Sequence, residues 1–152
     1  MYGVKIKRVS PNDPRLGHYV EKINELLKVL SAEKPQPHQT SLRKIGRVLE
    51  SDDFVLFVVE VNDEVAGMGS LHFHCTVTKQ AAYIEDVVVF PEFQGFSLGR
   101  KTVEYLINYA KKRDVKFIEL TSHPRRVAAN ALYEKLGFVD QETNLKRLFF
   151  KR

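Results

Sequence analysis

Runs of hydrophobic residues predict most of the strands of this chain. Residues 4–9 alternate apolar and polar side chains, as a half-buried strand does. Four longer runs are rich in the β-branched and aromatic residues that favour strands, at residues 54–61, 65–77, 81–90 and 116–121. The polar residues 62–64 predict a hairpin turn, and Pro91 is expected to end the run before it because proline has no N–H group to donate.

Apolar residues spaced by three and four positions predict two helices after the first strand. The first helix would bury Val20, Ile23, Leu27 and Leu30. After a proline-containing break at residues 35–37, the second would bury Leu42, Ile45 and Leu49. Thr40 or Ser41 is expected to cap this second helix, because a hydroxyl at the N-cap can accept from a free helix N–H group.

Two more helices are expected in the second half of the chain, at residues 97–113 and 128–138. Gly137 is expected to close the later one, since glycine readily adopts the left-handed conformation that ends many helices. In the earlier one, the side expected to cover the sheet carries Leu98, Thr102, Val103, Leu106, Ile107 and Ala110.

The order of these elements predicts an α/β (α+β) fold with a mixed, mostly antiparallel sheet and helices on both faces. With 152 residues and 43% hydrophobic content, the chain can bury one sizeable core, and we expect a single domain over residues 1–152. No apolar run approaches the length of a membrane span, and the start lacks the apolar centre of a signal peptide, so we expect a cytoplasmic protein. The single Cys75 excludes an internal disulfide framework and a thiolate-based structural zinc site.

The net charge of +5 is compatible with nucleic acid or with a smaller anionic ligand. The distribution favours the second, because two basic clusters, at residues 100–101 and 125–126, fall at or near predicted helix starts. A third cluster at 111–113 lies in the last turn of its helix, where cations offset the helix dipole and need no ligand. The sequence has no interleaved basic and aromatic motif and no recognition-helix pattern, which argues against nucleic acid.

The loop between the strand at 81–90 and the helix at 97–113 is a candidate anion site. It holds Gln94, Gly95, Ser97 and Gly99 just before a helix start, where backbone N–H groups lack partners and the helix dipole is positive. A nucleoside-triphosphate loop does not fit, because Gly99 is followed by Arg and Lys and the glycine spacing is one residue short. A dinucleotide fingerprint does not fit either, because it needs three glycines.

Residues 94–99 resemble the pyrophosphate loop of the GNAT superfamily of N-acetyltransferases, whose pattern is Arg or Gln, two residues, Gly or Ala, one residue, Gly or Ala. Gln94 and Gly99 match, and Ser97 departs from the pattern. A second block agrees: Asn130 and Tyr133 lie on one helix face ahead of a Leu-Gly-Phe sequence at 136–138. Two blocks in the correct order identify the chain as similar to this superfamily, and the segment 121–126 before the last helix resembles many uncharacterised bacterial or archaeal members.

The resemblance implies that acetyl-CoA is the co-substrate. In this family the acyl-CoA lies where two strands splay apart, here the strands at 81–90 and 116–121, and a final strand is expected at 146–151. The residues it implies for binding the pantetheine arm are Val87, Val88 and Val89. Those implied for the pyrophosphate are Gln94, Gly95, Phe96, Ser97, Leu98, Gly99 and Arg100, and those beside the thioester are Asn130 and Tyr133.

Ser97 has two interpretations. Its side chain stands where the family has Gly or Ala, so it could crowd the pyrophosphate or donate to it. The simpler interpretation is that the Ser97 hydroxyl caps the following helix, while the phosphates bind the remaining N–H groups.

The resemblance also implies two catalytic residues. Glu85 corresponds to a frequent general-base position and Tyr133 to the general acid, while Asp86 is the reserve base. Strand alternation would place Glu85 on the face of Val87 and Val89 and Asp86 on the opposite face, unless a bulge intervenes. The purely structural alternatives are a surface ion pair for Glu85 and a packed helix aromatic for Tyr133.

His72 and His74 are expected to share one strand face, where they could line the acceptor pocket. Two histidines without a third ligand make a poor metal site, so no metal is expected.

The function implied is transfer of an acetyl group from acetyl-CoA to a primary amine of a small molecule or peptide. The alternatives are an acyl-CoA-binding sensor without turnover and a nucleic-acid-binding protein, and the resemblance leaves a homodimer open.

Overall fold

The computed structural model describes residues 3–32 and 38–150. The chain forms two compact units, Met1–Thr121 and Ser122–Arg152. The expected break at residues 35–37 lies outside the described residues. Within the described ranges, no helix is long and apolar enough to cross a membrane.

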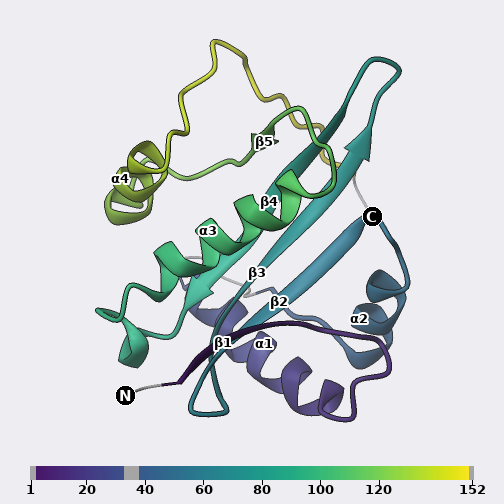
Figure 1. The fold of residues 1–152 in the computed structure, drawn as a ribbon, viewed down its shortest axis with the longest axis vertical. Helices are drawn as coiled ribbons and strands as arrows, with labels where there is room; N and C mark the ends of the chain where they lie inside the picture. The colour runs from purple at the N-terminus through teal and green to yellow at the C-terminus, as the bar shows by residue number, and fades with distance from the viewer. Residues whose placement is uncertain (1–2, 33–37, 151–152) are drawn as a thin grey trace. The chain divides into compact units, whose positions relative to one another are not determined.

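A five-stranded sheet forms the centre of the first unit, and its strand order β1-β2-β3-β4-β5 follows the chain (Figure 1). The first four strands pair antiparallel, and β5 pairs parallel to β4. The predicted hairpin turn is confirmed, with Asn62 and Asp63 both at positive φ between β2 and β3. The strands are β1 (Val4–Arg8), β2 (Phe54–Val61), β3 (Glu64–Cys75), β4 (Gln80–Val89) and β5 (Ile118–Glu119), so the last is much shorter than the expected 116–121.

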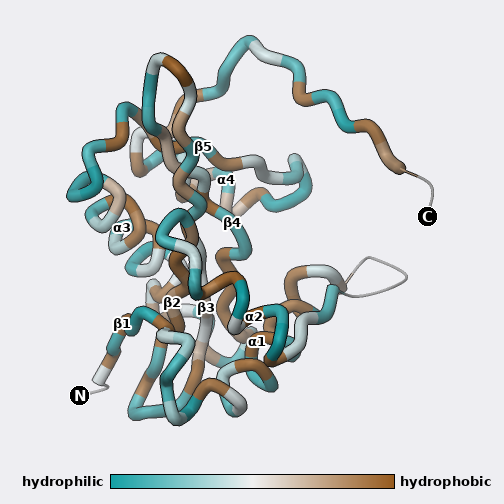
Figure 2. The backbone as a smooth tube through the Cα atoms, turned by 90° about the vertical axis from the view of Figure 1, so that its right-hand side faces the viewer, coloured by the Kyte–Doolittle hydropathy of each residue, from teal (hydrophilic) through white to brown (hydrophobic). Residues whose placement is uncertain are grey.

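Helices cover both faces of the sheet, as expected from the sequence. α1 (Leu16–Leu30) and α2 (Leu42–Leu49) pack in one core cluster with residues of β2, β3 and β4 such as Met68 and Val88. Ile45 and Leu49 of α2 are buried as predicted, but the prediction for Leu42 is wrong, because this first residue of the helix is exposed. On the other face, α3 (Leu98–Lys111) places Leu98 beside Val59 and Ala66, and Tyr105 and Tyr109 pack edge-on against Phe57. Figure 2 shows hydrophobic residues along the central strands.

The predicted inner side of α3 is buried at Leu98, Thr102, Val103, Leu106 and Ala110 and half-buried at Ile107. The cap of α2 is also confirmed: Ser41 has an extended backbone and accepts a hydrogen bond from the N–H of Lys44 at 3.2 Å.

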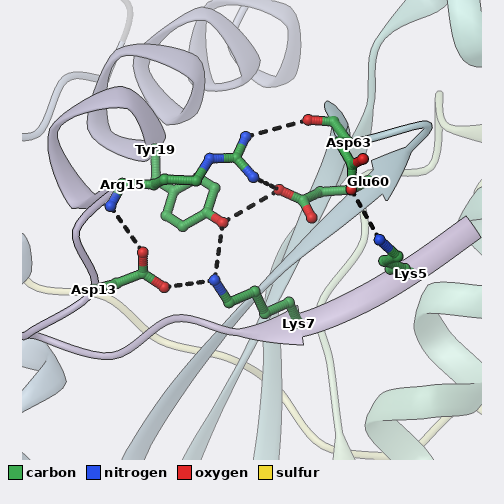
Figure 3. A network of polar contacts seen from close by, with 7 residues as sticks. All are labelled: Lys5, Lys7, Asp13, Arg15, Tyr19, Glu60 and Asp63. Carbon is green, nitrogen blue, oxygen red and sulfur yellow. Dashed lines mark hydrogen bonds and ion pairs between the residues drawn. The ribbon is translucent and has the colours of Figure 1, made fainter.

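A polar network fixes the start of α1 to the sheet (Figure 3). Arg15 Nη1 lies 2.6 Å from Oε1 of the buried Glu60, and the hydroxyl of Tyr19 donates to the same oxygen at 3.2 Å. Lys7 Nζ lies 2.7 Å from Asp13 Oδ2 and also donates to the Tyr19 hydroxyl. A buried carboxylate is costly unless it is paired, so this network ties α1, β1 and β2 together.

The second unit contains α4 (Val127–Lys135), which ends as the sequence predicts. Gly137 has φ +92°, its N–H group donates to the carbonyl of Glu134, and the N–H of Phe138 donates to the carbonyl of Tyr133. These two hydrogen bonds are the Schellman pattern of a helix terminus.

The final strand expected at 146–151 is wrong over its described part, since residues 146–150 form no strand. A strand needs a hydrogen-bonding neighbour, and the described residues of the second unit contain no other strand to pair with this segment. Four large apolar side chains in this segment and just before it are exposed: Leu145, Leu148, Phe149 and Phe150.

Candidate active site

The predicted anion loop follows β4 and leads directly into α3. After the short 3-10 turn η1 (Pro91–Phe93), the backbone is left-handed at Gly95 (φ +92°) and at Ser97 (φ +56°). Left-handed residues in a turn are a feature of backbone loops whose N–H groups bind anions. A Cβ built on Gly95 or Gly99 would meet nothing within 4 Å, so the space in front of both glycines is open.

The expected hydroxyl cap at Ser97 is wrong. Ser97 occupies the N-cap of α3 but makes no side-chain cap hydrogen bond, because its φ of 56° and ψ of 24° differ from the extended backbone that a hydroxyl cap needs. Ser41, at φ −127° and ψ 160°, shows the geometry that does support a cap. The N–H groups of the first turn of α3 therefore stay available to a ligand.

The other loop residues divide between core and surface. Leu98 is buried against the sheet, so only its backbone N–H group can reach a ligand. Gln94 and Phe96 are exposed, and Arg100 pairs with Glu104 at 2.8 Å through an exposed contact. Such pairs contribute little energy, so the guanidinium of Arg100 can turn toward an anion.

The edge of β4 that faces away from β3 is open over its second half. β5 pairs with Ala82 and Tyr83 only, whereas β3 pairs with β4 as far as Val89. Within the described first unit, no other strand covers residues 84–89 on that side. Half of the backbone N–H and C=O groups of these residues, which include Val87, Val88 and Val89, are thus presented to an added chain that carries amides.

A β-bulge does intervene in β4, and it corrects the expected faces. Ser70 pairs with Glu85 but Met68 pairs with Val88, so β4 has one extra residue, and Asp86 there has φ +53°. Val88 and Met68 belong to the core cluster that α1 and α2 cover. Met68 lies two residues from Ser70 and therefore on the same side of β3. Glu85 therefore shares a face with Val88, not with Val87 and Val89 as strict alternation predicts.

Val87 and Val89 lie on the α3 face. Val89 packs against the cluster that contains Leu98 of α3. A Cβ atom added to Gly69 of β3 would lie 3.5 Å from Val87 Cγ2 and closer still to the side chains of Thr102 and Leu106 of α3. The Val87 side chain therefore lies on the same face of the sheet as these α3 side chains.

Polar side chains gather on the α1 and α2 face beside Glu85, which is exposed. His72 pairs across the strands with Tyr83, and Tyr83 pairs with Glu119 on β5, so the three side chains share one face. His74 follows His72 on the same face, as predicted, with the two ring centroids 6.4 Å apart. No group of three or more His, Cys, Asp or Glu in the described ranges could hold a metal ion.

Asn130 and Tyr133 belong to the second unit and share one side of α4. Asn130 Nδ2 donates to the carbonyl of His123 at 3.1 Å, which fixes the amide and leaves its oxygen for another donor. The Tyr133 ring packs edge-on against Phe138 with centroids 5.8 Å apart, the apolar contact that accompanies this kind of helix end. Burial raises the pKa of Tyr133, with Arg126 opposing it, so the phenol keeps its proton at neutral pH.

Sequence reasoning did not find Glu119 as a neighbour of Glu85. The place of Glu119 depends on the register between β4 and β5, and the shared face of Glu85 and Val88 depends on the bulge; hydrophobic patterning encodes neither of them. The available signal was Asp86, since aspartate is one of the few residues that tolerate positive φ.

The chain is similar to several known proteins in sequence and in fold. An uncharacterised N-acetyltransferase of Porphyra purpurea is 26% identical over 109 residues, which cover 72% of this chain but only 61% of that protein. Glucosamine 6-phosphate N-acetyltransferase of Arabidopsis thaliana is 28% identical over 95% of this chain and 96% of its own length. Its crystal structure superposes with a TM-score of 0.74 at 26% identity, and the match covers 97% of this chain and 99% of that one.

An aminoglycoside acetyltransferase from an uncultured soil metagenomic sample, crystallised with sisomicin, has a TM-score of 0.82 over 98% of this chain and 97% of its own. At 16% identity it supports the fold alone. The family model described as acetyltransferase (GNAT) family matches residues 23–138, which include the open edge of β4, the loop before α3 and α4. Because this match spans most of the sequence, the chain belongs to the acetyltransferase (GNAT) family.

Proposed function

We propose that this protein transfers the acetyl group of acetyl-CoA to a primary amine of a small molecule or peptide. The observation that carries the proposal is the open edge of β4, which runs directly into the anion-binding start of α3. The pantetheine arm of CoA carries amides and ends in a pyrophosphate, so its two kinds of polar group fit the edge and the loop in that order.

The loop residues present fit a pyrophosphate. Gly95 and Gly99 leave room for close approach, the first turn of α3 supplies N–H groups, and Arg100 supplies a cation. Val87, Val88 and Val89 would pair through their backbones with the pantetheine amides. Asn130 would bind the cofactor through its free amide oxygen.

Acetyl transfer needs a neutral amine and a proton for the leaving thiolate. In the proposal, Glu85 accepts the amine proton, directly or through water, as the new C–N bond forms. Tyr133 donates its phenolic proton to the sulfur as the C–S bond breaks, so the proton count balances. The raised pKa of Tyr133 is compatible with a proton donor and not with a base.

The first experiment is a thermal-shift titration with CoA and acetyl-CoA, with NAD and ATP as controls, because a ligand that binds the folded state raises the melting temperature. We expect a shift with the two CoA compounds only. Steady-state thiol release should then be measured with an amine panel that includes glucosamine 6-phosphate, on which the Arabidopsis relative acts by its name.

Two glycine substitutions test the loop. Gly99→Leu should abolish most of the CoA shift, because a side chain would block the approach of phosphate to the backbone. Gly17→Leu is the matched control, since Gly17 is likewise the second residue of its helix and a Cβ there also meets nothing within 4 Å. Equal CoA shifts in both variants would exclude the loop as the phosphate site.

CoA binding without thiol release from any amine, even in single-turnover conditions, would favour a binding module over an enzyme.

A further inference from the structure

His72, Tyr83 and Glu119 lie side by side in one row across three adjacent strands of the sheet. His72 on β3 is the pairing partner of Tyr83 on β4, which in turn is the partner of Glu119 on β5. Paired residues point to the same face, and this is the face of Glu85, two residues beyond Tyr83. Two residues of strand span about 7 Å and neighbouring strands lie about 5 Å apart, so Glu119 lies roughly 8 Å from Glu85 along a diagonal.

The polar ends of these side chains are not used by the rest of the fold. Among the described residues, no hydrogen bond or ion pair involves the carboxylates of Glu85 and Glu119 or the hydroxyl of Tyr83. The buried carboxylates of the same unit are paired, Glu60 with Arg15 and Asp13 with Lys7, whereas Glu85 and Glu119 are exposed. Unpaired polar groups of several kinds at one level of a sheet face fit the recognition of a ligand.

The direction of the acceptor follows from the proposed position of acetyl-CoA. Its phosphates would lie at the carboxyl end of β4, before α3, and its thioester at the other end of the arm, near Glu85 and Asp86. Tyr83 and Glu119 lie on the face of Glu85 and on the side away from the phosphates, so the remaining atoms of an amine that reaches the thioester beside Glu85 can extend toward them.

We propose that Glu119 and Tyr83 form the outer half of the acceptor site and select an aliphatic amine with a second cationic group. This inference rests on the proposed acetyl transfer. The carboxylate of Glu119 would pair with the second ammonium, while the ring of Tyr83 contacts the carbon chain and its π face attracts the cation. Glu119 is a specificity residue and takes no part in proton transfer.

The test compares 1,5-diaminopentane with 1-aminopentane, which differ only in the second amine. In the wild type we expect the KM for the diamine to be about fivefold lower, the upper range for an exposed ion pair. Glu119→Gln should reduce this preference to the statistical factor of about two that two equivalent amines give the diamine, with kcat for both amines and the CoA thermal shift unchanged. Glu50→Gln, which removes an exposed carboxylate at the end of α2, is the matched control and should keep the preference.

The same preference can be measured without turnover, by calorimetric titration of both amines into the CoA complex. A diamine preference that depends on Glu119 but is accompanied by no thiol release would contradict the proposed enzyme and support this site. Equal affinity of the wild type for both amines, or a preference above about twofold that survives Glu119→Gln, would overturn the inference. A kcat/KM for glucosamine 6-phosphate above that for the diamine would also overturn it, because Glu119 would repel a phosphate.

Discussion

Two serines occupy helix N-caps in this protein, and their backbone angles decide what each hydroxyl does. The extended Ser41 accepts from a helix N–H group, whereas the left-handed Ser97 does not. A non-glycine residue in the left-handed region is strained by the contact of its Cβ with the backbone. Ser97 therefore adds strain to the loop without contributing a cap.

Ser97→Gly should raise the free energy of unfolding or leave it unchanged, with a gain of up to about 1 kcal/mol, because glycine removes the left-handed strain. Ser41→Gly should instead lose a few tenths of a kcal/mol with its cap. Urea denaturation of both variants measures whether each substitution raises or lowers the free energy of unfolding. A clear loss in Ser97→Gly would mean that the hydroxyl stabilises the loop after all.

Tyr133→Phe separates the packing of this residue from its chemistry. The ring contact with Phe138 is kept while the phenolic proton is removed, so CoA affinity and melting temperature should change little. Single-turnover acetylation should slow by about 10²-fold or more, in line with the loss of a general acid. Single-turnover rates are needed because product release can hide the effect in steady state. An unchanged rate would leave the thiolate to water or another donor.

At the scale of elements, the bulge in β4 sets the geometry of the site. It places Glu85 on the same face as Val88 and lies within the stretch of β4, residues 84–89, that β5 does not cover. The backbone of Asp86, at φ +53°, is the feature that allows this extra residue.

Substitution of Asp86 by Val and by Gly isolates this backbone effect, because both remove the carboxylate. Valine is strongly disfavoured at positive φ and glycine is not, so Asp86→Val should be less stable than Asp86→Gly by about 1–2 kcal/mol. Thermal denaturation of the two variants measures the difference. Equal stability would indicate that the bulge can close or move to another residue.

Much of this element structure follows from the sequence, for a physical reason. Hydrophobic period and turn residues are local, so they predicted β2, the turn at Asn62 and Asp63, the buried side of α3 and the end of α4 at Gly137. The face of Glu85 and its closeness to Glu119 depend on strand register and a bulge, which arise from pairing between distant segments. The expected strand at 146–151 failed similarly, since a strand requires a partner.

At the scale of the whole molecule, the network at the start of α1 makes stability depend on pH. The hydrogen bond from Lys7 holds the pKa of Asp13 below its ordinary value of 3.8, and the bond to Asp13 raises the pKa of Lys7. A lowered acid pKa stabilises the fold above the unfolded value and is lost as the pH falls through the folded one. The contribution of Asp13 is therefore complete at neutral pH and declines below about pH 4, as the pH approaches the lowered pKa of the folded state.

Asp13→Asn should lose about 1–2 kcal/mol at pH 7, because the Asp13 side chain is buried and its partner is charged. The difference from the wild type should shrink as the pH falls from 7 toward 3, because the wild-type carboxyl loses its charge as the pH approaches the lowered pKa of the folded state. Asp63→Asn is the control, since Asp63 and its partner Lys5 are both largely exposed, and we expect little change at any pH. Urea titrations from pH 3 to pH 8 test both variants. A difference for Asp13→Asn that persists at pH 3 would contradict the ionic origin.

The agreement of strand order with chain order governs how the sheet can assemble during synthesis. From β2 onward each new antiparallel strand follows its partner after a short turn, so little loop entropy is lost at each step. β1 is the exception, because α1 and α2 separate it from β2. The strand that leaves the ribosome first therefore stays without a partner until both helices and β2 have emerged, while β3 and β4 each find their neighbour already made.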